Sequence, residues 1–145
     1  MSINKILKNK FESFVDNRGS LLPLSLDLIP FKPKRIFVVN DVPIGCVRGN
    51  HSHHKTEQYL ICTQGSVDVF LDDGYNTKTI NLNKNEGVLI PYLVWDSQKF
   101  LTKNTEILVI CSTEYDINDY ILTYDEFIKA IENNETKKAN IVEGV

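Results

Sequence analysis

Short segments rich in β-branched and aromatic residues alternate with turn residues along most of the chain. These segments span residues 35–42, 58–73, 77–82, 87–95 and 105–112. Glycines that suit tight hairpins separate them, at Gly65, Gly74 and Gly87. The pattern predicts a mainly β chain of antiparallel strands, folded as a barrel or jelly roll.

Only the C-terminal part of the chain has helical periodicity. Thr123 and Glu126 form a capping-box sequence at its start. The apolar residues that follow at helical spacing are Phe127, Ile128 and Ile131. We expect a short helix there, packed outside the β domain. Residues 133–145 are polar and aperiodic, which predicts one domain over residues 1–132 and a flexible C-terminal tail.

Composition narrows the classes of protein to consider. A chain of 145 residues with 42% hydrophobic and 24% charged residues is the size and type of one globular domain. Its net charge of −3 provides no basic field for nucleic acid or for an anionic membrane. The sequence has neither a signal-peptide core nor an apolar run of roughly 20 residues. We therefore expect a cytoplasmic protein that binds neither nucleic acid nor membranes.

Cysteine usage agrees with a reducing compartment. Cys46, Cys62 and Cys111 are odd in number, widely separated and surrounded by apolar residues. This arrangement predicts reduced thiols in the core rather than disulfides or a thiolate metal cluster.

The stretch RGNHSHHKTEQ, residues 48–58, is the strongest chemical signal. Side chains alternate between the two faces of a strand, so His51 and His53 should point the same way and His54 the other. Two imidazoles in one cavity suit either proton transfer near neutral pH or metal binding. Spacing alone leaves both roles open.

The histidines also fit a known motif, and the chain resembles the cupin superfamily at that point. The residues that match its first motif are Gly45, His51, His53 and Glu57, and Gly65 falls one residue later than the usual place. The second motif normally supplies another histidine, but this chain has none after His54, and only Asp96 could replace it. Because a catalytic metal generally needs three or more protein ligands, we expect no metal at this site.

A second resemblance covers most of the chain. The stretches DNRGSL (16–21), RGNHSHHKTEQYL (48–60), GSVDVFLDDG (65–74), IPYLVW (90–95) and TEYDINDYILTYDEF (113–127) are similar to the dTDP-sugar 3,4-ketoisomerases. The resemblance implies conversion of dTDP-4-keto-6-deoxy-D-glucose into a dTDP-3-keto-6-deoxyhexose without metal or redox cofactor. An aminotransferase would then use the product, toward the 3-amino-3,6-dideoxy sugars of surface glycans such as lipopolysaccharide.

This chemistry gives the histidines specific roles. Moving a ketone from carbon 4 to carbon 3 needs a base, an enediol intermediate and a returned proton. We assign His51 as the base and His53 as its partner, which orients the substrate or shuttles a hydroxyl proton. The enolate oxygen needs a hydrogen-bond donor. The family often has a tyrosine on the preceding strand, where this chain has Phe37.

The substrate-binding residues are predicted with the same resemblance in view. Arg48 is the first candidate for a pyrophosphate contact, although strand alternation requires a bend at Gly49 for it to reach the cavity. Trp95 is a candidate for stacking on thymine. Arg18, at a position that is arginine in the enzymes giving the galacto product, favours that product. Asp96, expected to pair with Arg18 or His51, leaves a mixture of products open.

Other classes of function stay open at this point. A metal-dependent cupin would use His51, His53 and Glu57 as ligands. A dTDP-sugar 3,5-epimerase would act on the same nucleotide sugar, and a non-catalytic sugar-binding cupin would keep the pocket alone. We also expect a homodimer, with exchange of N-terminal strands left open, because a small β domain has edge strands to cover.

Overall fold

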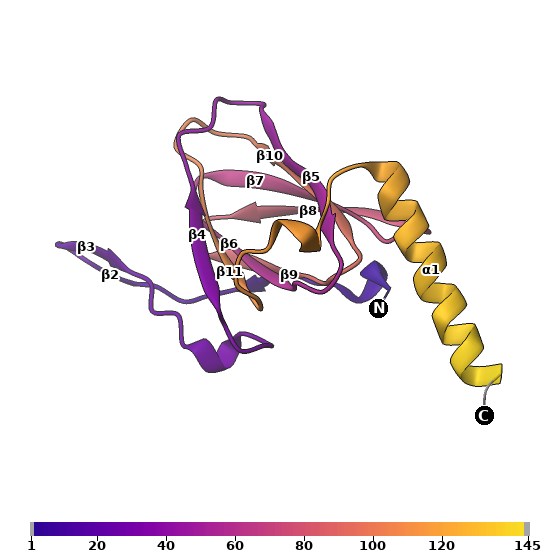
Figure 1. Ribbon diagram of the computed structural model, residues 1–145. Helices are drawn as coiled ribbons and strands as arrows, with labels where there is room; N and C mark the ends of the chain where they lie inside the picture. Colours follow the sequence, from indigo (N-terminus) through magenta and orange to yellow (C-terminus); the bar gives the residue numbers. More distant parts are fainter. Residues whose placement is uncertain (1, 144–145) are drawn as a thin grey trace.

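The computed structural model describes residues 2–143 as two antiparallel β-sheets that face one another, with a helix at one end (Figure 1). The first sheet has the strand order β1 (Asn9–Lys10), β9 (Glu86–Ile90), β6 (Gln58–Gln64), β11 (Glu106–Cys111), β4 (Arg35–Val39). The second has the order β12 (Tyr120–Ile121), β5 (Val47–His53), β10 (Trp95–Phe100), β7 (Ser66–Asp72), β8 (Thr77–Asn83). The predicted mainly β, jelly-roll fold is confirmed.

The segments predicted as strands at 35–42, 77–82 and 105–112 correspond to β4, which ends at Val39, and to β8 and β11. The segment 58–73 divides at Gly65, which has φ +81°, into β6 and β7, as its turn sequence predicted. The prediction of one strand over 87–95 is wrong at its C-terminal end, because β9 stops at Ile90 and Leu93 adopts a φ of +55°. The strand β10 that begins at Trp95 was not predicted.

The core lies between the two sheets and combines inward-facing residues of both. Its central side chains include Leu60 and Val88 from the first sheet and Val69 and Leu82 from the second. Cys62 and Cys111 are buried free thiols, as predicted, but the prediction is wrong for Cys46, which is exposed. Burial raises the pKa of Cys62 to about 11, so this thiol stays protonated and unreactive.

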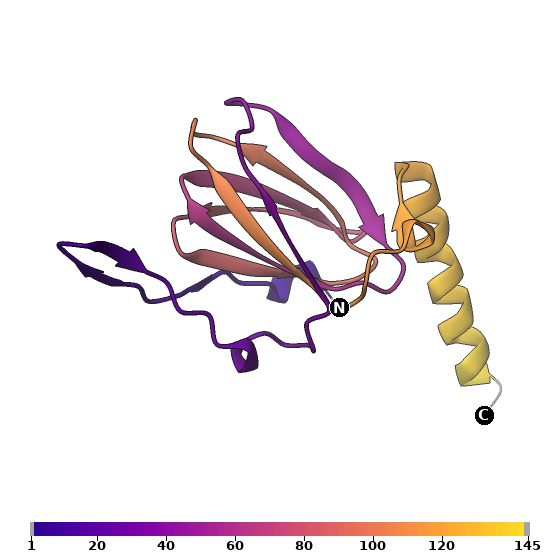
Figure 2. The ribbon, with the colours of Figure 1, turned by 60° about the vertical axis from the view of Figure 1, so that its left-hand side comes forward.

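The N-terminal segment covers the outer face of the first sheet. Phe11, Leu24, Ile29 and Phe31 pack there against Tyr59 and its neighbours. The hairpin of β2 (Phe14–Asp16) and β3 (Gly19–Leu21), by contrast, pairs only with itself and projects away from the body (Figures 1 and 2). Short 3-10 turns occur at Ile3–Lys5 (η1), Leu26–Leu28 (η2) and Ile117–Asp119 (η3).

The helix α1 (Tyr124–Glu143) packs against the outer face of the second sheet through its first turns. The Thr123 hydroxyl accepts a hydrogen bond from the Glu126 amide at 3.2 Å, which confirms the predicted N-cap. The helix continues to Glu143, beyond the short helix that the sequence predicted, and so includes residues 133–143 of the expected flexible tail. Residues 144–145 of that tail lie outside the described residues. No helix of residues 2–143 is both long and apolar enough to span a membrane.

Candidate active site

A β-bulge in β5 determines which side chains share the cavity between the sheets. His51 pairs with Asp96 and Gly49 pairs with Ser97, so Asn50 is an extra residue without a partner. Gly49 and Asn50 have φ values of +88° and +56°. The extra residue shifts the alternation of side chains by one position, so Arg48 lines the same cavity as His51 although the two are three residues apart. The bend expected at Gly49 is therefore present.

The cavity itself is small, about 80 Å³, and lies between β4, β6 and β11 on one side and β5 and β10 on the other. Its polar part is formed by side chains from β5, β6 and β10. The residues that line it are Phe37, Val39, Arg48, Gly49, His51, Gln58, Leu60, Asp96, Gln98, Ile107 and Val109. One arginine, one histidine, one carboxyl group and two glutamine amides thus meet in a space whose other walls are apolar.

His51 is a neutral imidazole in this setting. Its ring lies 5.1 Å from the His53 ring and 5.5 Å from the Tyr120 ring, centroid to centroid. Burial, with a smaller contribution from His53, lowers the pKa of His51 to about 4. An unprotonated imidazole at neutral pH can accept a proton.

Asp96 lies beside His51 and is buried. Its Oδ1 is 4.0 Å from His51 Nε2 and accepts a 2.6 Å hydrogen bond from the Gln98 amide, whereas Oδ2 has no hydrogen-bond partner among the described residues. Burial raises the pKa of Asp96 to about 7, against the opposing effect of Gln98. This carboxyl group is therefore neutral below that pH and then places no negative charge beside His51.

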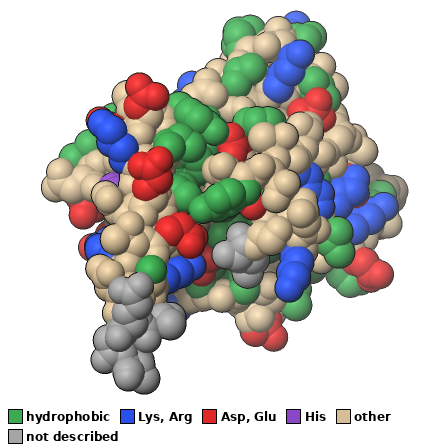
Figure 3. Space-filling view, turned by 90° about the vertical axis from the view of Figure 1, so that its right-hand side faces the viewer, with side chains coloured by type: hydrophobic (Ala, Val, Ile, Leu, Met, Phe, Trp, Pro, Cys, Tyr) green, Lys and Arg blue, Asp and Glu red, His purple; other side chains and the backbone are tan. Residues whose placement is uncertain are grey.

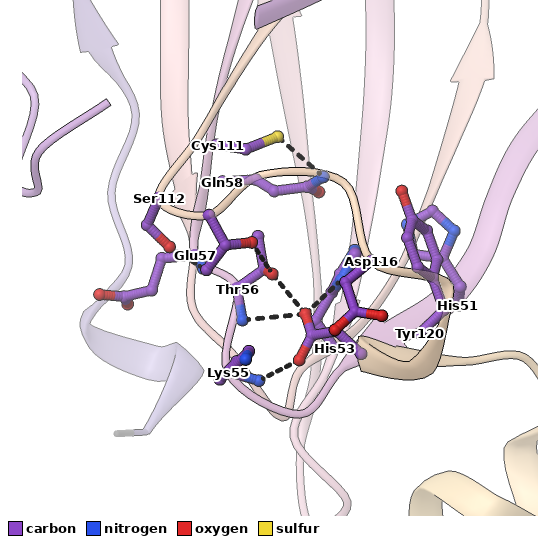
Figure 4. Close-up of polar contacts among 12 residues, drawn as sticks. His51, His53, Lys55, Thr56, Glu57, Gln58, Cys111, Ser112, Asp116 and Tyr120 are labelled. Carbon is purple, nitrogen blue, oxygen red and sulfur yellow. Dashed lines mark hydrogen bonds and ion pairs between the residues drawn. The ribbon is translucent and has the colours of Figure 1, made fainter. Parts of the chain in front are cut away.

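His53 has a different partner, the carboxylate of Asp119. His53 is buried, and its Nδ1 lies 3.1 Å from Asp119 Oδ2, while its Nε2 has no partner within residues 2–143. Burial lowers the pKa of His53, and the hydrogen bond and charge of Asp119 oppose that shift. Figure 4 shows the hydrogen bonds around His53, Lys55 and Thr56.

Tyr120 joins the two histidines and was missed by the sequence analysis. It pairs with His53 across β12 and β5, and its ring centroid is 4.4 Å from that of His53. Arg35 Nη1 donates to the Tyr120 hydroxyl at 3.4 Å, and the Arg35 guanidinium also lies over the Tyr115 ring. The signal was present in the stretch 113–127, but only the long-range pairing of β12 with β5 brings this tyrosine to the site.

Two other predicted substrate-binding residues lie away from this cavity. Arg18 is in the turn of the projecting hairpin, where it pairs with Asp16 at 2.5 Å and is 86% exposed. Within one chain, Asp96 lies beside His51, 4.0 Å from its Nε2, and away from Arg18. Trp95 faces the opposite side of β10 and packs against Tyr124 and Phe127 of α1. Within one chain, the structure does not place Trp95 for stacking on a base in the cavity.

Glu57, the third ligand of a possible metal site, also lies apart from the histidines. Its backbone amide is held by Ser112, and it borders a different groove (Figure 4). Among residues 2–143, no group of three or more histidine, cysteine, aspartate or glutamate side chains is arranged to hold a metal ion.

That groove, about 580 Å³ in volume, is the larger hollow and lies between α1 and the nearby turns of the sheets (Figure 3). It contains neither histidine. The residues that line it are Ser2, Glu57, Asp73, Tyr75, Asn76, Pro91, Tyr92, Leu93, Val94, Ile131, Asn134, Glu135 and Lys138. Its size exceeds that of the cavity, but it lacks the paired proton-transfer groups, so the cavity beside His51 is the candidate active site.

Comparison with known proteins identifies the family of this chain. Residues 4–132 match the family model described as FdtA: WxcM-like, C-terminal. The chain is 36% identical over 130 residues to TDP-4-oxo-6-deoxy-alpha-D-glucose-3,4-oxoisomerase from Aneurinibacillus thermoaerophilus, and the match covers 88% of this chain and 92% of that protein.

Solved structures give the same answer. A 3,4-ketoisomerase from Helicobacter canadensis has a TM-score of 0.80 at 38% identity, covering 88% of this chain and 98% of that one. QdtA, a sugar 3,4-ketoisomerase from Thermoanaerobacterium thermosaccharolyticum in complex with TDP, has a TM-score of 0.82 at 35% identity, covering 92% and 98%. The chain therefore belongs to the FdtA family of WxcM-like, C-terminal domains, whose similar members are sugar 3,4-ketoisomerases, a class of isomerases.

Proposed function

We propose that this protein converts dTDP-4-keto-6-deoxy-D-glucose into a dTDP-3-keto-6-deoxyhexose by histidine-mediated proton transfer through an enediol. The observation that carries the proposal is the pair of adjacent imidazoles, 5.1 Å apart, in a chain whose similar relatives are 3,4-ketoisomerases. The relative from Aneurinibacillus is named for this 4-oxo sugar, and QdtA was solved with TDP.

The proposed reaction conserves atoms and electrons. His51 takes the proton from carbon 3, and the C–H electron pair forms the carbon 3–carbon 4 double bond of the enediol. The hydroxyl proton on oxygen 3 moves to oxygen 4, and His51 returns its proton to carbon 4. Since no net electrons leave the sugar, the reaction needs no redox cofactor, and we propose that it needs no metal.

The developing charge on the enolate oxygen needs a nearby donor. Phe37 lines the cavity where the family often has a tyrosine, and a phenyl ring cannot donate. Tyr120 packs on both histidine rings and receives a hydrogen bond from Arg35. Tyr120 is the hydrogen-bond donor we propose, with the Asp96 carboxyl group in its neutral form as a second hydrogen-bond donor.

The nucleotide part of the substrate requires more space than the cavity offers. About 80 Å³ is well below the roughly 300–1,000 Å³ of typical ligand sites. The nucleotide must then lie at the mouth of the cavity, where Arg48 supplies a charge-assisted contact for pyrophosphate. A second copy of the chain would complete the walls of that mouth.

We propose that this second copy forms a homodimer through the projecting hairpin, with the N-terminal strands exchanged. Phe14, Val15 and Leu21 of the hairpin are 67%, 75% and 61% exposed, and an isolated two-stranded hairpin is marginally stable in water. Ile36 and Val38 on the edge strand β4 are also more than half exposed. Another protomer would cover both surfaces.

The dimer bears on the stereochemistry of the product. Arg18 at the tip of the hairpin cannot act on its own cavity in this arrangement, but exchanged hairpins would carry it to another protomer. We propose that the galacto product is favoured, and that Asp96 beside His51 permits some of the gluco epimer. The 3-keto product would then feed the synthesis of 3-amino-3,6-dideoxy sugars for surface glycans.

The test is incubation of the purified protein with dTDP-4-keto-6-deoxyglucose in deuterium oxide, followed by proton NMR. The expected result is a 3-keto product that carries deuterium at carbon 4, because the proton on His51 exchanges with solvent before it is returned. The product formed in ordinary water keeps a proton at carbon 4, and its coupling constants assign the configuration there. Deuterium at carbon 5 with inversion would indicate an epimerase instead. Unchanged substrate without label would indicate a binding protein, and either outcome would overturn the proposal.

A further inference from the structure

Asp119 is a buried carboxylate that receives hydrogen bonds from several donors at once. The amide of Lys55 donates to Oδ1 at 2.9 Å, and the amide of Thr56 donates to Oδ2 at 3.2 Å. The Thr56 hydroxyl also donates to Oδ2, and His53 Nδ1 lies 3.1 Å from the same oxygen. Asp119 itself is only 4% exposed. A chain separation of 66 residues makes this contact with His53 a product of the tertiary fold.

These contacts keep Asp119 ionised. Burial raises its pKa, but the hydrogen bonds from Thr56, Lys55 and His53 oppose burial, and the net shift is downward. An ionised carboxylate can only accept hydrogen bonds, so the proton of the His53 contact must lie on Nδ1. In the neutral ring, Nε2 then carries the lone pair, and this nitrogen is buried and unpartnered among the described residues.

His51, on the same strand, has no comparable partner. The carboxyl group near it belongs to Asp96, which is 4.0 Å away and already accepts a hydrogen bond from Gln98. His51 is therefore free to present either nitrogen, whereas His53 is held in one tautomer with a negative charge behind it. The two imidazoles are chemically distinct although they are two residues apart.

We propose that Asp119 is a positioning residue that holds the ring of His53 and fixes it as the Nδ1–H tautomer, with the lone pair on Nε2. This inference rests on the proposed function, in which His53 passes the hydroxyl proton from oxygen 3 to oxygen 4 of the sugar. The O3–H bond breaks as Nε2–H forms, and Nε2–H breaks as O4–H forms. Between these steps, Asp119 stabilises the imidazolium.

Replacing this carboxylate by an amide has a specific consequence. In Asp119→Asn a single oxygen replaces the two carboxylate oxygens. It can face the backbone amide of Lys55, or it can face Thr56 and His53, but not both. If the NH₂ group faces His53, it donates to Nδ1 and forces the proton onto Nε2. The ring then keeps its place but has no lone pair toward the substrate.

The first test needs no variant. Long-range proton–nitrogen NMR of the wild-type protein, with His53→Asn used to assign the signals, reports which ring nitrogen carries the proton. The expected result is protonation at Nδ1 of neutral His53. Protonation at Nε2 would overturn the proposal. This measurement does not depend on turnover, so inactivity of the wild-type protein on the sugar nucleotide would overturn the proposed function without deciding the tautomer.

The second test compares Asp119→Asn with Asp116→Asn. Asp116 caps the same turn, η3, through its contact with the Asn118 amide, but does not touch His53. We expect Asp119→Asn to lower kcat about 100-fold or more with a smaller change in KM, and to shift the His53 nitrogen signals. Asp116→Asn should keep the wild-type kcat and the wild-type His53 nitrogen signals. Equal losses in the two variants, or kcat within threefold of wild type for Asp119→Asn, would overturn the proposal.

Discussion

His51 and His53 lie side by side on β5, yet their surroundings give them different acid–base behaviour. Burial lowers the pKa of both imidazoles. For His53, the hydrogen bond and charge of Asp119 oppose part of this shift, whereas among the described residues no carboxylate opposes it for His51. The difference predicts distinct effects of substituting each histidine.

Replacing His51 by asparagine should abolish turnover and leave the fold intact. Asparagine keeps a polar side chain facing the cavity but removes the base, so we expect kcat to fall at least about 100-fold. The assay is NMR detection of the 3-keto product, with circular dichroism as the check on folding. His54→Asn is the matched control, because His54 is exposed just after β5 and should tolerate the change. Activity of His51→Asn within threefold of wild type would contradict the assignment.

The pH dependence of kcat/KM should reflect the environment of His51. An exposed histidine is half protonated near pH 6.5, but burial disfavours the imidazolium and lowers the pKa of His51 to about 4. Protonation removes the base, so kcat/KM should be maintained down to about pH 5 and decline as the pH falls toward 4. Circular dichroism at each pH separates this decline from acid unfolding. A half-maximal point near pH 6.5 would disagree with a buried, neutral base.

Chelation should leave the activity unchanged. The possible ligands His51, His53 and Glu57 do not converge, since Glu57 borders a separate groove and His53 Nδ1 already contacts Asp119. We expect prolonged dialysis against EDTA to preserve kcat, measured under the same conditions before and after treatment. Loss of activity that a stoichiometric divalent ion restores would make the histidines metal ligands.

Among the strands, the bulge in β5 has the most direct effect on the site. A Cβ atom at Gly49 would lie 3.0 Å from Gln98 Oε1 and 3.1 Å from both the Asp96 carbonyl oxygen and Ser97 Cα. The positive φ of this residue adds backbone strain for any other side chain. Gly49 therefore allows β5 and β10 to approach closely where the cavity residues emerge.

Gly49→Ala should reduce both stability and activity. We expect a loss of about 1–3 kcal/mol in the free energy of unfolding, measured in urea, together with a lower kcat/KM as Arg48 and His51 are displaced. Gly45→Ala is the control, because Gly45 also has a positive φ, +84°, but an added Cβ would contact nothing within 4 Å. If the two variants lose the same stability and activity, the close contact with β10 is unimportant.

The success of the sequence analysis differs from strand to strand for a physical reason. Strands such as β6 and β11 face the apolar core, so hydrophobic residues indicate them. In β10 the inward residues Asp96 and Gln98 are polar, since they line the cavity, and the usual pattern is absent. Tyr120 and Asp119 lie on a short turn and strand whose pairing with β5 depends on the whole fold. Their positions could not follow from local sequence.

For the whole molecule, the hairpin of β2 and β3 is the feature that a single chain leaves unexplained. Its apolar residues point into solvent, and its turn carries Arg18 far from the cavity of the same chain (Figures 1 and 2). A homodimer accounts for both observations. Sedimentation velocity at low micromolar concentration should therefore show a dimer.

A charge on the hairpin should dissociate that dimer. Val15→Lys places an ammonium group on a surface that is 75% exposed in one chain and buried in the proposed assembly, so we expect monomers by sedimentation. Ile141→Lys is the control, since Ile141 is 69% exposed on the distant end of α1. A wild-type monomer, or an unchanged Val15→Lys dimer, would remove the hairpin from the interface.

The helix α1 combines two different local stabilities in one continuous element. Phe127 is completely buried against the second sheet, but from Glu135 to Ile141 every described side chain is exposed. A helical segment whose side chains are exposed gains little from tertiary packing and depends on its own weak cooperativity. Amide hydrogens near Phe127 should therefore exchange with solvent only when the domain opens, whereas those beyond Glu135 should exchange by local fraying. A single hydrogen-exchange experiment would thus locate, within a few residues, where the folded domain ends inside an unbroken helix.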